Sequence, residues 1–164
     1  MKKVAYFLLS IFLFMILIYV YIMDVKTRVD IVGTNEAFEV DTNTKFFVPI
    51  IKTNEKDKVK VAKILFSKYI EYTFKNIDMQ EGAINPLKDY KIEKVEFIQD
   101  LEDKSFETFI TYDLQAKDGY IDYCTVGNGI ENKNNWVKGN RIIINIRQLD
   151  KDKYTICHMS SRVR

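Results

Sequence analysis

The strongest constraint on the fold is an uncharged apolar run, Val4–Met23, near the start of the chain. At about 1.5 Å per helical residue, a run of this length covers roughly 30 Å, which is the thickness of a bilayer core. It is longer than the apolar region of a cleaved signal peptide, and Tyr19–Asp24 contains no small residue at which a signal peptidase would cut. The run therefore predicts an uncleaved transmembrane helix, with residues 4–23 holding the protein in a membrane.

The charges around this run predict its orientation. Lys2 and Lys3 precede it, so the positive-inside rule places the N-terminus in the cytoplasm. The chain carries 25 basic and 23 acidic residues, and these two lysines account for the whole surplus of +2. The rest of the chain is neutral, which argues against nucleic acid as a partner. We expect a single-pass protein of the cell membrane with an extracellular C-terminal domain.

The chain is predicted to divide into three parts. Residues 1–23 would form a cytoplasmic stub and the transmembrane helix. Residues 24–52, punctuated by Gly, Asn and Pro, would form a juxtamembrane linker with one short strand. Residues 53–164 would form an extracellular α+β domain. Its apolar residues at helical spacing predict a helix over 56–77, with Asn54 as the N-cap.

Alternating residues after this helix predict antiparallel hairpins. Tyr90–Gln99 and Ser105–Lys117 form one pair, and Trp136–Leu149 and Lys153–Ser160 form another. In the first strand the apolar positions change parity near Glu93-Lys94, and one extra residue there, as in a β-bulge, restores a single apolar face. A helix followed by strands predicts a helix packed on a curved antiparallel sheet.

This order of elements resembles the nuclear transport factor 2-like superfamily, in which a cone of bent sheet surrounds helices. The resemblance covers about residues 50–160, and a cystatin-like helix on a sheet would look nearly the same. The loop Gly127-Asn-Gly129, followed by Asn135-Trp-Val137, is similar to small membrane-anchored or secreted members from Gram-positive bacteria. Ile, Lys and Asn make up 52 of the 164 residues, which suits the AT-rich genome of a low-GC Gram-positive bacterium.

The candidate ligand-binding residues are Tyr69, Tyr112, Trp136 and His158. Aromatic side chains could line a cone cavity for a small apolar ligand, although core packing explains the same residues. The resemblance implies that hydratases and isomerases of the superfamily use Asp, His or Tyr in the cone, which points to Tyr112 and His158 here. A single His near a strand end is more often structural, because a general base needs an orienting partner and a reacting group.

Cys124 and Cys157 could form a disulfide outside the cell, and two buried free thiols are the alternative. Neither the cysteine spacing nor the single His matches a zinc motif. The loop Gly127-Asn-Gly129 lacks the remaining residues of a phosphate-binding motif. We therefore expect no catalytic residues, no metal and no cofactor.

These features favour a non-enzymatic interaction or assembly module that binds another protein or further copies of itself. The predicted layout also resembles single-span, cone-domain components of type IV secretion and conjugation machines. Two alternatives stay open. One is a small-ligand-binding or sensory domain, and the other is a hydrolase or isomerase that uses the cone cavity.

Overall fold

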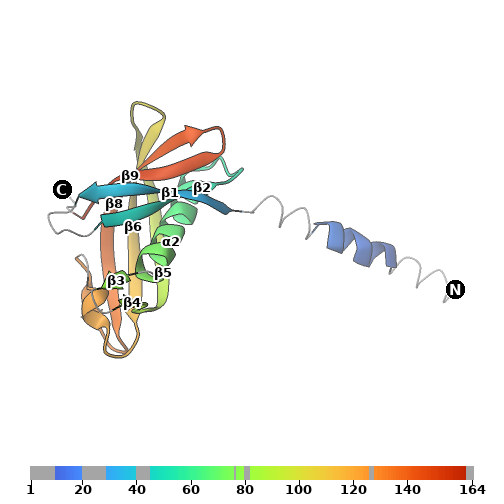
Figure 1. The fold of residues 1–164 in the computed structure, drawn as a ribbon. Coiled ribbons are helices and arrows are strands. Elements are labelled where there is room, and N and C mark those ends of the chain that lie inside the picture. The colour runs from blue at the N-terminus through green and yellow to red at the C-terminus, as the bar shows by residue number, and fades with distance from the viewer. Residues whose placement is uncertain are drawn as a thin grey trace.

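The structure of the chain is a computed structural model that describes residues 10–19, 29–39, 45–75, 77–79, 82–125 and 128–161. Most of these residues lie in antiparallel strands (Figure 1). After a helix over residues 10–19, the elements in chain order are β1 (Asp30–Glu39), β2 (Lys45–Lys52), α2 (Lys58–Lys75), β3 (Ile77–Met79), β4 (Gly82–Ile84), β5 (Leu87–Asp100), β6 (Ser105–Ala116), η1 (Ile121–Tyr123), β7 (Ile130–Asn132), β8 (Trp136–Asp150) and β9 (Lys153–Ser160).

Seven of the described strands form one sheet. Its order is β1-β2-β9-β8-β6-β5, and β7 pairs with the start of β8. β3 and β4 form a separate hairpin. α2 contacts β5 at one edge of the sheet and β2 near the other edge, so the sheet curls around the helix. Figure 1 shows β1 and β2 lying across the direction of the long strands β5, β6 and β8.

The predicted fold class, a single transmembrane helix ahead of an α+β domain, is wrong. The described part of the chain is mostly sheet, and no helix in it is long and apolar enough to cross a membrane. Within the predicted span, the structure describes residues 10–19, which are helical. Residues 4–9 and 20–23 lie outside the described residues.

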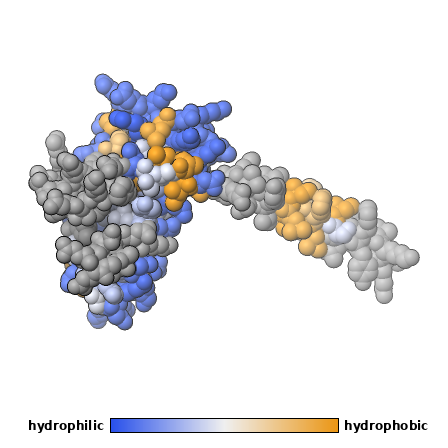
Figure 2. Space-filling view, viewed as in Figure 1, coloured by the Kyte–Doolittle hydropathy of each residue, from blue (hydrophilic) through white to orange (hydrophobic). Residues whose placement is uncertain are grey.

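The predicted localisation depended on that helix. A single-pass position in the cell membrane, with a cytoplasmic N-terminus and an extracellular domain, is not supported by the described helices. Figure 2 shows where apolar residues gather on the visible face: on the helix over residues 10–19 and over the start of β1. At the start of β1, Ile31 and Val32 are each nearly half exposed.

β1 and β2 occupy the segment that the sequence suggested as a linker. They pair with each other from Asp30 with Lys52 to Glu39 with Lys45. β2 then joins the last strand of the chain through the pair Ile51 and Tyr154. Ile51 is fully buried, so this segment contributes to the core. The pairing of β2 with β9 joins residues about a hundred positions apart, which short-range pattern reading does not detect.

α2 lies inside the predicted helical range, but its N-cap is Asp57 and not Asn54. The Asp57 carboxylate accepts hydrogen bonds from the backbone N–H groups of Val59 at 2.9 Å and Lys60 at 3.2 Å. These are donors that the first helical turn cannot satisfy itself. The face toward the sheet is buried through residues spaced three or four apart, namely Ala62, Leu65, Phe66, Ile70 and Phe74.

The predicted β-bulge in β5 is confirmed. Ile92 pairs with Tyr112 on β6, whereas Lys94 pairs with the next residue, Thr111, so Glu93 is the extra residue. The bulge returns Val95 to the face of Ile92, and both pack against the core. One inserted residue thus allows the whole strand to present a single apolar face to α2.

The long strands end in two different structures. The upper end in Figure 1 consists of Thr53–Asp57 and the turns Leu101–Lys104 and Lys151–Asp152. The lower end consists of residues 117–125 and 128–135, with η1 and β7. These two names are used below.

A buried polar network closes the lower end. The Asn140 side chain, which is 1% exposed, accepts a hydrogen bond from the Gly129 N–H at 3.1 Å and donates one to the Val137 carbonyl at 3.1 Å. Asp113 accepts the Gly139 N–H at 2.8 Å. Gly129 is therefore attached to β8, and this contact gives it a structural role.

Candidate functional site

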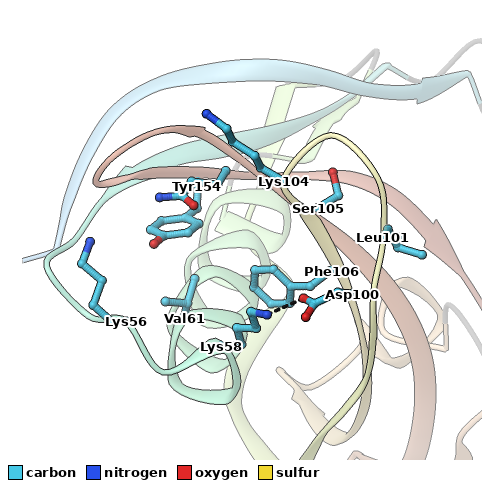
Figure 3. A pocket seen from close by; sticks show the side chains of 10 residues that line it. Lys56, Lys58, Val61, Asp100, Leu101, Lys104, Ser105, Phe106 and Tyr154 are labelled. Atoms are coloured by element: carbon cyan, nitrogen blue, oxygen red, sulfur yellow. Dashed lines mark hydrogen bonds and ion pairs between the residues drawn. The ribbon is translucent and has the colours of Figure 1, made fainter.

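A pocket of about 390 Å³ lies at the upper end, beside the first turn of α2 (Figure 3). Its walls come from three segments that are far apart in the sequence: the start of α2, the β5–β6 turn and the β8–β9 hairpin. Val61, Leu101, Phe106 and the ring of Tyr154 provide apolar lining. The other lining residues, apart from Tyr154, are charged or polar, and the volume falls in the range of small-molecule sites.

Hydrogen bonds between the surrounding segments hold the pocket open in a defined shape. The Thr53 N–H donates to the Asp152 carbonyl at 2.8 Å, which ties the segment before α2 to the β8–β9 turn. The Gln148 N–H donates to the Lys104 carbonyl at 3.1 Å, which ties β8 to the β5–β6 turn. The pocket is thus preformed, and a ligand would not have to order these loops.

Three lysines and one aspartate give the pocket its charge. Lys58 forms an ion pair with Asp100, and its ammonium lies 5.1 Å from the ring centre of Phe97 and 5.9 Å from that of Phe106. A second register shift in β5, between Phe97 and Gln99, sets Asp100 opposite Phe106 and hence on the α2 side of the sheet.

The other two lysines have no carboxylate partner among the described residues. The Lys56 ammonium donates a hydrogen bond to the Lys151 carbonyl at 2.9 Å. The Lys104 ammonium makes no hydrogen bond or ion pair with any described residue. With Lys58 neutralised by Asp100, the pocket keeps two positive charges.

Tyr154 supplies a polar group from the pocket wall. The residue is 5% exposed, yet its hydroxyl makes no hydrogen bond within the part of the chain that the structure describes. Burial, followed by the charges of Asp152 and Glu55, raises the pKa of Tyr154 above its ordinary value. The phenol is therefore a proton donor at neutral pH.

Two of the predicted ligand-binding residues, Tyr69 and Tyr112, lie together on the α2 side of the sheet. The ring of Phe66 stacks on Tyr69 with centroids 5.8 Å apart and meets the edge of Tyr112 at 4.9 Å. Burial raises the pKa of both phenols. These contacts are those of core packing, which the sequence left open as the alternative reading.

The other two, Trp136 and His158, lie on the opposite face of the sheet. Trp136 at the start of β8 pairs with Gln115 of β6, and His158 of β9 pairs with Asn145 of β8. Both partners point away from α2, since Gln115 lies between the buried Leu114 and Ala116, and Asn145 lies between the buried Ile144 and Ile146. The structure therefore does not bring the four predicted residues into one site, nor does it place His158 near Tyr112.

Both cysteines are free in the structure. Cys124 is fully buried at the lower end, and burial raises the pKa of its thiol to about 11. Cys157 is half-buried in β9, where its Sγ donates to the Asn145 carbonyl at 3.4 Å. Throughout the described ranges, no group of three or more His, Cys, Asp and Glu side chains is placed to hold a metal ion.

Comparison with known proteins adds no assignment. No family model matches the chain, and neither a curated protein nor a solved structure matches it. The resemblance to the nuclear transport factor 2-like superfamily stays a prediction.

Sequence reasoning missed the pocket residues Lys58, Lys104 and Tyr154. The hairpin of Tyr90–Gln99 and Ser105–Lys117 was predicted, but the position of its turn beside the start of α2 depends on the curl of the sheet. The composition of the β5–β6 turn was the one local signal. Asp103 and Lys104 occupy the centre of a tight hairpin turn, where Asn and Gly are the usual residues.

Proposed function

We propose that this domain is a protein-interaction module whose partner docks at the upper end. The observation that carries the proposal is the preformed pocket, which combines apolar walls with an unpaired lysine and a phenol. Anchor side chains that fill such pockets provide much of the binding free energy in protein complexes.

Exposed apolar residues near the ends of β5 and β8 support a protein partner. Phe97 and Ile98 at the end of β5 are 42% and 43% exposed, and Leu149 at the end of β8 is 47% exposed. The ammonium of the pocket residue Lys58 lies over the ring of Phe97, so this apolar surface adjoins the pocket. Apolar side chains gathered beside a pocket are typical of protein-binding surfaces.

A free small molecule is the second candidate occupant. The volume of about 390 Å³ falls in the range of small-molecule sites. This alternative corresponds to the ligand-binding or sensory domain that the sequence left open, although the pocket is at a different place from the predicted cone cavity.

Site-specific photo-crosslinking in cells that make the full chain tests the proposal. The photoreactive residue p-benzoylphenylalanine replaces Phe97 or Leu149 at the upper end, and Ile130 at the lower end serves as the control. Ile130 is 77% exposed, so random collisions would label it at least as well. We expect discrete protein adducts from the two upper positions only, and an adduct of twice the chain mass identifies a second copy. Equal labelling at Ile130, or no adduct from the upper positions, contradicts the proposal.

A further inference from the structure

We infer that the pocket at the upper end binds a carboxylate joined to an apolar group. The source of that carboxylate, an acidic side chain or the C-terminus of the partner, rests on the proposed function. The ligand chemistry itself rests on the pocket residues alone.

The charge of the pocket selects an anion. Lys104 has no partner within the described chain, and Lys56 uses one of its three ammonium protons on the Lys151 carbonyl. Two lysines are thus available to a bound anion. Because the pocket is partly enclosed, these interactions are screened less than on an open surface.

The pocket favours a carboxylate over a phosphate. Phosphates commonly bind to the free N–H groups at a helix N-terminus. Here the Asp57 carboxylate already accepts the N–H groups of Val59 and Lys60. Asp100 also lines the pocket, and Glu55 and Asp152 lie near Tyr154. These negative charges oppose a dianion more strongly than a monoanion.

The apolar walls require that the carboxylate be attached to an apolar group. Val61 and Phe106 are already almost fully buried, so Leu101 and the neighbouring Phe97 are the apolar side chains that stay in contact with water if a small polar anion binds alone. An aromatic or aliphatic group beside the carboxylate would cover them and gain free energy from burial. A phenylalanine at a C-terminus, or a glutamate beside an aromatic residue, has this combination.

Tyr154 completes the set of donors. Its hydroxyl has no hydrogen-bond acceptor among the described residues. A carboxylate oxygen in the pocket can accept that O–H. The hydrogen bond would replace the contact of this hydroxyl with solvent.

Titration of the ¹⁵N-labelled full chain with 3-phenylpropionate tests the ligand chemistry. The uncharged 3-phenylpropanamide and the dianion phenyl phosphate serve as matched comparisons, because all three carry the same ring. We expect amide-proton shifts at Leu101, Ser105 and Gln148, and at least tenfold tighter binding of the carboxylate than of either comparison ligand, which corresponds to one charge-assisted contact. Equal binding of the amide would overturn the inference.

Variants test the named donors. Lys104→Glu is expected to weaken 3-phenylpropionate binding at least tenfold, and Tyr154→Phe about threefold to fivefold, as for one hydrogen bond. Lys133→Glu makes the same charge change at the lower end and is the matched control. An equal loss of binding in the Lys133→Glu chain would show a non-specific charge effect and overturn the inference. The comparison of ligands uses the unaltered chain, so it does not depend on the folding of any variant.

Peptide binding distinguishes the two sources of the carboxylate. Crosslinking distinguishes the carboxylate site from the proposed interaction module. An acetylated peptide ending in a free Phe carboxylate is compared with an amidated peptide containing Glu-Phe; binding of either, with loss on neutralising its carboxylate, supports the inference. Photo-crosslinks at Phe97 that survive in the Lys104→Glu chain would overturn the carboxylate site while leaving the interaction module intact. Carboxylate binding without any crosslink would overturn the interaction module and identify a free small acid as the ligand.

Discussion

The two ends of the long strands carry tight turns of the same geometry but of different composition. At the upper end the turn centres on Asp103 and Lys104, and at the lower end on Asn134 and Asn135. All four residues have positive φ, between 55° and 61°, as a type I′ hairpin turn requires at its two central positions. Asn tolerates this conformation well, whereas Lys does not.

The two ends therefore differ in how far their residues favour local stability. The lower end combines a suitable Asn-Asn turn with a network in which Asn140 and Asp113 satisfy buried N–H groups. The upper end holds a lysine in an unfavourable backbone conformation, and that lysine lines the pocket with no partner in the described chain. Local strain of this kind occurs at functional sites, which agrees with the proposed binding role.

The largest expected contrast concerns access to the lower end, and Cys124 reports it. In the native chain at pH 8, Cys124 should react with iodoacetamide at least about a hundredfold more slowly than Cys157. The Cys124 thiol is fully buried and burial raises its pKa to about 11, so very little reactive thiolate is present. Mass spectrometry of time points gives both rates, and urea should remove the difference. Comparable native rates would show that the lower end opens readily.

The next largest effect is expected from removing the buried amide at the lower end. Asn140→Ala leaves the Gly129 N–H and the Val137 carbonyl without their partner and should lower the free energy of unfolding by about 2–3 kcal/mol. Urea denaturation of the full chain measures the change. Asn132→Ala, at an exposed position of β7, is the control and should change stability by less than about 0.5 kcal/mol. Similar values for the two variants would remove the lower network as a source of stability.

A methyl group at Gly129 tests the same network from its other side. A Cβ at this position would lie 2.5 Å from Oδ1 of Asn140, closer than real contacts allow, so the buried amide must move. We expect Gly129→Ala to lower the free energy of unfolding by about 1–2 kcal/mol, because one hydrogen bond is lost or distorted. At Gly33 the nearest atom would be 3.7 Å away, so Gly33→Ala is a control without a clash. Unchanged stability of Gly129→Ala would mean that the loop is not held as the structure has it.

Local patterns in the sequence predicted the elements that depend on neighbouring residues. The helix of α2 and the bulge in β5 follow from the spacing of apolar side chains over a few turns or pleats, and both are present. The transmembrane helix was the wrong prediction, because no helix in the described part of the chain is long and apolar enough to cross a membrane.

Long-range arrangement could not be read from the same patterns. The partner of β2 is the last strand of the chain, and the pocket joins turns that are about fifty residues apart. Lys104 and Tyr154 are ordinary residues in a turn and a strand until the curl of the sheet brings them beside α2. Conversely, Tyr112 and His158 share aromatic character but lie on opposite faces of the sheet, which depends on strand register.

Exchanging the residues of the two turns tests the comparison directly. Lys104→Asn should raise the free energy of unfolding by roughly 0.5–1 kcal/mol, since Asn adopts positive φ more easily, while carboxylate binding is weakened. Asn135→Lys at the matching position of the lower turn should lower it by a similar amount, and it also removes the hydrogen bond from Asn135 to Asp118. Thermal denaturation of each variant measures its change in stability. A stabilised Asn135→Lys chain, or a destabilised Lys104→Asn chain, would refute the backbone argument.

The smallest effect is expected for the ion pair between Lys58 and Asp100. Their side chains are 44% and 64% exposed, so solvent and salt screen the interaction despite the close contact. A double-mutant cycle with Lys58→Met and Asp100→Asn should give a coupling free energy below about 1 kcal/mol, decreasing further in 0.5 M salt. Lys58→Met alone also removes the contacts of the ammonium with the rings of Phe97 and Phe106, so its single effect should exceed the coupling. A coupling above about 2 kcal/mol would mean that this pair stabilises the upper end as strongly as Asn140 stabilises the lower one, and the contrast between the two ends would then lie in the turns alone.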